Sequence, residues 1–433
     1  MKFKEAYPDI PAERDACGII AVLQKDAKPS HSNVRRVLDS LYRMAHRAGT
    51  IRGEGDGTGV QTDIPRELWE GYLTEAGLDG RIAYNPRFFV GHFFIPRSQE
   101  GRVQEFFDLF RIEGNRRGVR VILERRGETN PRVLGPVGRR TEPLFFQIAG
   151  LATEGEAPLW ELGIFCEDNF PVHVVSLSTT TVTYKVRGSS EILKHYYPAL
   201  SKSEYKSAVT LGHNRYSTNT LSTFEQVQPF GLLGHNGEIN TIERLRREAT
   251  FLGIPLSGGS DSQDLNRILE GLIHRFGLSL PEALDLVFPP IIGEIRHYSP
   301  VLQDLYAALR HRGGPFAQGP AALITRYEDE AVFATDAMGL RPLWLVETEA
   351  EYVFSSERGV FSVDEFVAEP RPFAPGEKVL VRLDGDMVRL ATYERYQRVV
   401  LERTLARSGE LSGQRALLFG PPGDLPTSLV TMT

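Results

Sequence analysis

Short apolar runs alternate along the chain with segments in which apolar residues recur at the period of a helix. The run at residues 17–23 is headed by a cysteine, contains a glycine and several aliphatic residues, and predicts a buried strand. Residues 32–47 place apolar side chains on one side of a helix, which Ser32 could cap. The chain is therefore expected to begin with a buried strand followed by an amphipathic helix.

The same rules predict a mixture of strands and helices over the rest of the chain. The acidic stretch 150–162 has no clear period and predicts a loop, and His235-Asn236-Gly237 predicts a tight turn between a strand at 229–233 and a helix at 240–252. Further strands are expected at 87–96, 118–126, 143–149, 172–178, 181–187, 208–216, 320–326, 330–335, 343–347 and 352–355, further helices at 100–117, 260–276, 280–287 and 298–311, and a hairpin at 377–383 and 387–392.

Composition and charge exclude several classes of protein. The chain has 433 residues, of which 41% are hydrophobic and 24% charged, as in a soluble globular protein. A net charge of −6 gives no basic footprint for nucleic acid or for an anionic membrane surface. No apolar run approaches the roughly 18–20 residues that span a membrane, and residues 1–16 lack the apolar core of a secretory signal. Ten scattered histidines predict no metal site, and two cysteines fit a cytoplasmic location.

The two cysteines stand in different surroundings. Cys17 is at the tip of the first strand, ahead of a glycine, where a thiol is either a nucleophile or a small buried hydrophobe; taken alone, the second is favoured. Cys166 lies in an apolar patch and is expected to be structural. The glycine-rich segment 53–59 lacks the spacing of a dinucleotide loop and follows a helix, so a backbone turn is expected there.

Two blocks in the centre of the chain favour the interpretation of Cys17 as a nucleophile. They are GHNRYSTNT at 212–220 and GLLGHNGEINT at 231–241. They resemble blocks of the class II glutamine amidotransferases, which are N-terminal-nucleophile hydrolases, and in particular of the glutaminase domain of glutamate synthase. The resemblance implies an α+β fold, a four-layer αββα sandwich of two mostly antiparallel sheets between helices. Motifs in the family's order extend it over residues 13–392: ERDACG at 13–18, MAHRAG at 44–49, GDGTGV at 55–60, FVGHFFIP at 89–96, YKVRG at 184–188, GSDSQDLN at 259–266, GPAAL at 319–323 and DAMGLRP at 336–342.

The resemblance implies a reaction and three catalytic residues. L-glutamine would be hydrolysed to glutamate and ammonia through a thioester on Cys17. As the first residue of a processed chain, Cys17 would carry its own base, because an α-amine with a pKa of about 7.7–8.0 can accept the thiol proton. The Asn236 side-chain amide and the Gly237 N–H would stabilise the oxyanion. His213 and His235 are expected to pack or hydrogen-bond instead of catalysing.

The same resemblance implies how glutamine is recognised. Arg215 would bind the α-carboxylate of glutamine, and Asp261 would bind its α-ammonium group. Taken alone, Arg215 is explained as well by a surface ion pair and Asp261 by a helix N-cap. Thr218 is a further substrate-binding candidate, and Arg47 and Asn240 are candidates for supporting groups near the nucleophile.

The resemblance also sets expectations for domains and partners. Residues 1–16 are expected to be a leader, residues 17–392 a glutamine amidotransferase type 2 domain, and residues 393–433 a C-terminal helix and mobile tail. No cofactor is expected in this chain, since FMN and an iron–sulfur cluster would belong to a separate glutamate synthase subunit that receives the ammonia. Three alternatives stay open: a non-catalytic regulatory or scaffold subunit that retains its leader, the amidotransferase subunit of another ammonia-using synthase, and a hydrolase of another amide on the same fold.

Overall fold

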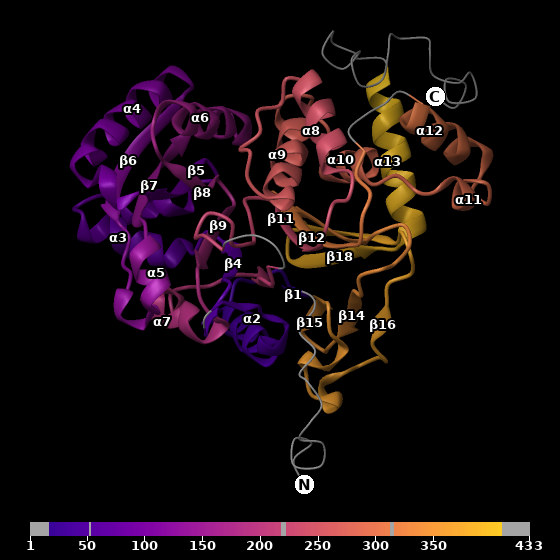
Figure 1. Ribbon diagram of the computed structural model, residues 1–433, viewed down its shortest axis with the longest axis horizontal. Coiled ribbons are helices and arrows are strands. Elements are labelled where there is room, and N and C mark those ends of the chain that lie inside the picture. Colours follow the sequence, from indigo (N-terminus) through magenta and orange to yellow (C-terminus); the bar gives the residue numbers. More distant parts are fainter. Residues whose placement is uncertain (1–16, 52, 218–221, 312–315, 409–433) are drawn as a thin grey trace.

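Two antiparallel sheets form the centre of the computed structural model, which describes residues 17–51, 53–217, 222–311 and 316–408 (Figure 1). The first has seven strands in the order β16-β14-β15-β1-β10-β4-β9, and the second has five in the order β11-β12-β13-β17-β18. The strands of the first sheet are β1 (Gly18–Gln24), β4 (Thr58–Asp63), β9 (Thr181–Val186), β10 (Val209–Asn214), β14 (Trp344–Glu347), β15 (Glu351–Ser355) and β16 (Arg371–Pro372). Those of the second are β11 (Leu233–Gly237), β12 (Ala321–Tyr327), β13 (Glu330–Thr335), β17 (Lys378–Asp384) and β18 (Met387–Ala391).

Strand β1 is buried on both faces, which explains its continuous apolar run. It lies between β10 and β15 in the seven-stranded sheet. Ile19, Ala21 and Leu23 pack between the two sheets, whereas Ile20 and Val22 pack on the opposite face. Side chains alternate between the faces of a strand, so a strand covered on both sides needs apolar residues at every position.

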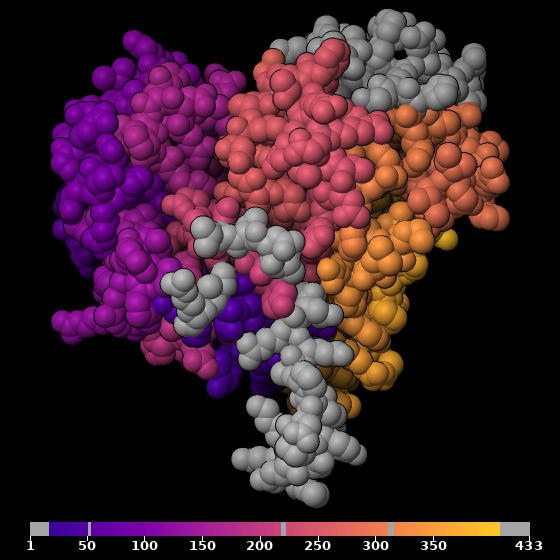
Figure 2. Space-filling view, viewed as in Figure 1, coloured from indigo at the N-terminus to yellow at the C-terminus, as the bar shows by residue number. Residues whose placement is uncertain are grey.

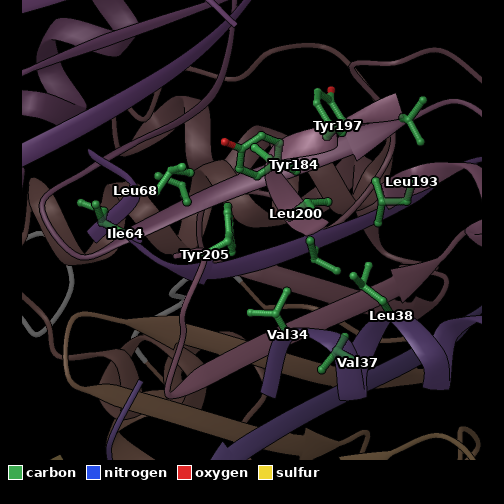
Figure 3. Packing of buried hydrophobic residues seen from close by; sticks show 14 of the residues in the cluster. Val34, Val37, Leu38, Ile64, Leu68, Tyr184, Leu193, Tyr197, Leu200 and Tyr205 are labelled. Carbon is green, nitrogen blue, oxygen red and sulfur yellow. The ribbon is translucent and has the colours of Figure 1, made fainter. Parts of the chain in front are cut away.

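Helix α2 (His31–Arg43) covers the outer face of the seven-stranded sheet. Its residues Val34, Val37 and Leu38 point into the core from one side of the helix, toward the packed side chains shown in Figure 3. Ser30 caps the helix by accepting a hydrogen bond from the Asn33 N–H, so the sequence-based choice of Ser32 was wrong by two positions.

Helices also cover the outer face of the five-stranded sheet. Leu265, Ile268 and Leu272 of α9 (Asp261–His274) pack with Leu323 of β12 and Val332 of β13 in one core cluster. The layer order is therefore helix, sheet, sheet, helix, and the predicted αββα sandwich is confirmed. The other helices of this region are α8 (Ile242–Phe251), α10 (Leu280–Val287), α11 (Ile292–Ile295), α12 (Pro300–His311) and α13 (Tyr393–Ser408).

A third sheet lies beside β9 and was not anticipated from the sequence. Its strands β6 (Val119–Arg126), β7 (Leu144–Ala152), β5 (Phe88–Ile95) and β8 (His173–Ser178) are antiparallel in that order. Helices α4 (Val103–Arg116) and α6 (Glu156–Asn169) pack on it. Figure 2 shows this indigo-to-magenta unit side by side with the pink helices α8 and α9 on one face of the molecule.

The prediction of a loop at 150–162 was wrong. Strand β7 continues to Ala152, and helix α6 starts at Glu156. Leu159, Leu162 and Cys166 form the buried side of that helix, with spacings of three and four residues, while acidic residues elsewhere in the segment obscure the period. Cys166 is fully buried there, and burial raises the pKa of its thiol to about 12.

The predicted turn at His235-Asn236-Gly237 is instead the end of strand β11. Asn236 pairs with Ala322, and Gly237 pairs with Ala321 of β12. The chain reverses earlier, where the Phe230 N–H donates to the Leu233 carbonyl, so the strand predicted at 229–233 lies mainly before the observed one. The other predicted elements are present with small shifts at their ends. None of the described helices is both long and apolar enough to cross a membrane.

The remaining short elements are the helices α3 (Arg66–Glu75), α5 (Pro136–Thr141) and α7 (Leu193–Tyr196) and the strands β2 (Thr50–Ile51) and β3 (Glu54–Gly55).

Candidate active site

Cys17 lies directly ahead of β1, half-buried, against the end of β10. The register of the two strands pairs Gly18 with Asn214, which carries the chain two residues further to Tyr216. The backbone N–H of Tyr216 donates to Sγ of Cys17 at 3.3 Å, and Sγ lies 3.6 Å from the Tyr216 carbonyl oxygen. The central sheet thus brings the block at 212–220 against the cysteine.

Cys17 lines a cavity of about 380 Å³, within the size range of small-molecule sites. The wall combines groups from β11, α8 and the start of α9 with groups from loops, including the segment that follows β10. Among the lining residues are Arg215, Gln226, Asn236, Gly237, Asn240, Asp261 and Arg341. Five of the residues predicted from the sequence, together with Cys17, therefore share one cavity.

Asn236 contributes a buried side-chain amide to this cavity. The residue is 1% exposed, and neither its Nδ2 nor its Oδ1 has a hydrogen-bond partner within the described residues. An unsatisfied buried polar group costs about 1–3 kcal/mol, so such an amide is expected to serve a ligand. Gly237 beside it has a φ of 146°, and an added Cβ would lie 1.7 Å from the Pro320 carbonyl oxygen, so only glycine fits.

Arg215 is buried, which excludes the surface ion pair considered from the sequence. It is 6% exposed, and its Nη1 donates to Ser222 Oγ at 3.2 Å and to Gln226 Oε1 at 3.4 Å. Its backbone is held on both sides, since its N–H donates to the Gly57 carbonyl at 2.8 Å and its carbonyl accepts from the Gly49 N–H at 3.0 Å. Burial lowers the pKa of the guanidinium, and the charges of nearby groups oppose that change.

The glycine-rich segment supports the chain around Arg215. Oδ2 of buried Asp56 accepts from the Ser217 N–H at 2.8 Å. A Cβ at Gly49 would lie 2.0 Å from that same oxygen, so a larger residue there would displace the Asp56 carboxylate. Gly53 and Gly57 have φ values of 79° and 147°, as a turn requires. The motifs at 44–49 and 55–60 thus fix the segment that follows β10.

Asp261 is the first residue of α9, and its carboxylate lines the cavity. The N-cap is Ser260, which forms a capping box with Gln263, so the interpretation of Asp261 as the N-cap was wrong. Oδ2 of Asp261 accepts from the Ile239 N–H at 2.9 Å, and Oδ1 accepts from the Ser262 N–H at 2.7 Å. The carboxylate therefore joins the helix start to the chain that follows β11.

The remaining predicted residues are placed differently. The guanidinium of Arg47 forms an ion pair with Glu357, and Arg47 is not among the residues that line the cavity. Asn240 is exposed and lines the cavity, and its N–H donates to the Gln318 carbonyl at 2.8 Å. Thr218 lies outside the described residues.

Gln226 and Arg341 are among the cavity residues that sequence reasoning missed. Nε of Arg341 is buried without a hydrogen-bond partner in the described part of the chain. Asp336 orders the loop that carries it, since its carboxylate accepts from the backbone N–H groups of Met338 at 2.9 Å and Leu340 at 3.0 Å. Arg341 belongs to the motif at 336–342, but no spacing in the sequence indicates that it faces Cys17.

The surroundings of Cys17 act on its thiol pKa in both directions. Burial raises the thiol pKa, although the Tyr216 N–H and the charges of Arg215 and Arg341 lower it. The sulfur contacts the backbone N–H and the carbonyl oxygen of Tyr216. His213 and His235 instead bond to other groups: His213 Nε2 lies 3.0 Å from the His235 carbonyl oxygen, and burial lowers the His213 pKa to about 3.

The described residues contain no group of three or more side chains arranged to hold a metal ion. The layered αββα arrangement, with a cysteine ahead of a central strand and beside a cavity, is the fold of the N-terminal-nucleophile hydrolases. The family model of the class-II glutamine amidotransferases matches residues 17–393, and the chain belongs to this family.

Two curated relatives are glutamate synthases. The chain is 31% identical over 421 residues to ferredoxin-dependent glutamate synthase 2 of Synechocystis sp., covering 87% of this chain and 26% of the relative. It is 27% identical over 410 residues to the NADPH glutamate synthase large chain of Azospirillum brasilense, covering 86% and 26%. The chain thus spans about a quarter of the length of these relatives. A solved glutamine phosphoribosylpyrophosphate amidotransferase from B. subtilis is 14% identical, with a TM-score of 0.43 and coverage of 87% of this chain and 49% of that one.

Proposed function

We propose that this chain hydrolyses L-glutamine to L-glutamate and ammonia, with Cys17 as the nucleophile. The observation that carries the proposal is that Cys17 shares one cavity with the unpartnered buried amide of Asn236 and with the guanidinium of Arg215. A nucleophile, an oxyanion donor and a cation for a carboxylate are the groups that hydrolysis of an amino acid amide requires. Membership of the class-II glutamine amidotransferases supports glutamine as the substrate.

The raised thiol pKa calls for a base, and the α-amine of Cys17 can supply it once the Ala16–Cys17 bond has been cut. The amine takes the thiol proton, and Sγ attacks the side-chain carbonyl carbon of glutamine. The oxyanion that forms accepts hydrogen bonds from the Asn236 amide and the Gly237 N–H. Collapse breaks the C–N bond, the leaving nitrogen takes the proton from the ammonium group, and ammonia departs. The γ-glutamyl thioester then reacts with water, which yields glutamate and restores the thiol.

Charge complementarity at the α-carbon of the substrate, which carries both a carboxylate and an ammonium group, sets its orientation. Arg215 binds the α-carboxylate, because a planar guanidinium pairs well with a carboxylate. Asp261 binds the α-ammonium group. Asn240 supports the mouth of the cavity, and Arg47 supports the helix end near the nucleophile through its ion pair with Glu357.

The ammonia is delivered to a separate glutamate synthase subunit that holds FMN and an iron–sulfur cluster. Support comes from the two relatives, which are named glutamate synthases. The redox groups of the synthase reaction supply electron transfer on the partner, and no step in this chain passes through them.

Purified protein incubated with L-glutamine, alone and with its synthase partner, tests the proposal when its intact mass is measured in parallel. We expect a chain that begins at Cys17 and that releases glutamate and ammonia in equal amounts. A chain beginning at Cys17 that releases neither product in either condition would overturn the glutaminase function. An inactive chain that keeps residues 1–16 would favour the non-catalytic scaffold.

A further inference from the structure

The segment at residues 222–228, called the strap below, runs past two parts of the active site. Ser222 Oγ and Gln226 Oε1 accept hydrogen bonds from Nη1 of Arg215. Gln228 Oε1 accepts from the His235 N–H at 2.7 Å, one residue before Asn236 on β11. The strap therefore contacts both the arginine assigned to the substrate carboxylate and the strand that carries the oxyanion amide.

Two cations from the motif YKVRG hold the strap from the other side. Nζ of Lys185 donates to the Glu225 carbonyl at 2.8 Å, and Nε of Arg187 donates to the Ser222 carbonyl at 3.0 Å. Lys185 is near the end of β9 and Arg187 directly follows the strand, and side chains two positions apart on an extended chain project to the same side. Lys185 is fully buried, and Arg187 is 3% exposed. Hydrogen bonds from buried charged donors are stronger than those between neutral groups.

The two cations differ in how their charge is compensated. Arg187 pairs with Glu54 at 2.7 Å. Lys185 has no ion pair with a carboxylate in the described ranges; its Nζ lies 3.0 Å from Nε2 of His173, whose Nδ1 is 3.4 Å from Oε1 of Glu167.

A buried ammonium group without a direct counter-ion is costly, and burial lowers the pKa of Lys185 to about 7. The Glu225 carbonyl accepts a second bond from Gln263 Nε2 at 3.2 Å. Gln263 in turn belongs to the capping box of α9, so this one carbonyl is tied to the start of the helix that carries Asp261. The buried Lys185, whose charge is unfavourable there, thus contacts the strap between Arg215 and the start of α9, which carries Asp261.

We propose that Lys185 and Arg187 are positioning residues for glutamine recognition, because they hold the strap in the place from which Ser222 and Gln226 orient Arg215. The inference rests on the proposed function. Neither cation touches the cavity that holds Cys17, so both act through the strap. Loss of either anchor releases Arg215 while leaving Cys17 and Asn236 on their strands, and binding of the α-carboxylate suffers more than the chemical step.

Lys185→Met tests this best, since it removes the donor and keeps much of the side-chain volume. Lys185→Gln, which keeps a donor, is the second variant in case the first does not fold. Lys206→Met is the matched control, because Lys206 pairs with Glu67 on the surface. Steady-state rates are measured with L-glutamine and with its α-amide, which lacks the carboxylate charge. For Lys185→Met we expect KM for glutamine to rise roughly ten- to a hundredfold with kcat nearly unchanged.

The preference for glutamine over its α-amide should fall by a similar factor in Lys185→Met, recover in part in Lys185→Gln, and stay unchanged in Lys206→Met. An unchanged KM, or an equal loss with both substrates, would overturn the inference. Calorimetric binding of L-glutamate and of its α-amide gives a second readout that needs no turnover. If the unaltered protein binds glutamate but hydrolyses no glutamine, the proposed function fails, and the effect of Lys185→Met on glutamate affinity still decides the role of the strap. If the unaltered protein binds no glutamate, both proposals fail.

Discussion

The backbone N–H of Tyr216 donates a hydrogen bond to Sγ of Cys17 at 3.3 Å, although 199 positions of the chain separate the two residues. The contact follows from the pairing of β1 with β10, which sets Gly18 opposite Asn214. Because the donor is a backbone group at the end of a buried sheet, the sulfur keeps a fixed position at the cavity wall. The reactivity of Cys17 is then set by the charges around it.

Arg341 is predicted to favour the thiolate of Cys17. Its charge lowers the thiol pKa, and its buried Nε has no partner among the described residues. Arg341→Met should therefore shift the pH midpoint of iodoacetamide labelling of Cys17 upward. Arg358→Met, which changes an exposed arginine paired with Glu369, should leave the midpoint where it is. Equal midpoints in the two variants would show that Arg341 does not act on the sulfur.

Asn236→Ala is predicted to slow the chemical step. Loss of one preorganised oxyanion donor typically lowers kcat about 10²- to 10³-fold, and KM should change little because the amide is not assigned to the α-groups of glutamine. Asn169→Ala is the control, since Asn169 Nδ2 donates to the Phe165 carbonyl at an exposed helix end. A kcat for Asn236→Ala equal to that of the control would remove Asn236 from the mechanism.

Gly237→Ala is predicted to destabilise the fold as well as the site. The φ of 146° and the 1.7 Å approach to the Pro320 oxygen leave no room for a Cβ, so strand β11 must shift away from β12. The free energy of unfolding in urea should fall by about 1–3 kcal/mol or more. Gly71→Ala in α3 meets no atom within 4 Å and should be neutral or stabilising by up to about 1 kcal/mol. Similar unfolding midpoints for the two variants would contradict this.

Acid is predicted to destabilise the protein through buried neutral histidines. Burial lowers the pKa of His213 to about 3, and of His92 and His274 to about 4. Between these values and the unfolded value near 6.5, the unfolded chain binds more protons, so stability falls as the pH falls. Each such histidine contributes a slope of up to about 1.4 kcal/mol per pH unit. His213→Gln should flatten the urea-unfolding dependence between pH 6.5 and about 4, whereas exposed His195→Gln should not.

Much of the fold follows from local pattern, and much of the site does not. Strand β1 was predictable because burial on both faces gives a continuous apolar run. Helix α2 was predictable because burial on one face gives apolar residues at helical spacing. The Asn-Gly pair at 236–237 favours a turn locally, but pairing with β12 makes it a strand end. Arg341 escaped notice because its approach to Cys17 depends on how distant loops meet.

The pairing of strands in the third sheet could not be predicted from the sequence either. Its individual strands were predicted, but nothing in their periodicity tells which strands pair, so their separation into a sheet of their own beside β9 could not be foreseen. The motif YKVRG, which includes Lys185, was recognisable in the sequence, whereas its contacts with the strap arise only from the packing of β9 against residues far along the chain.

Acid-quenched intact mass, measured after mixing the protein with L-glutamine, shows whether Cys17, freed as the first residue, forms a thioester. We expect an adduct on the chain that begins at Cys17, heavier by one glutamine less one ammonia, formed together with free ammonia and absent in Cys17→Ser. A chain that begins at Cys17 and binds glutamine, yet shows neither adduct nor ammonia, would rule out Cys17 as the nucleophile.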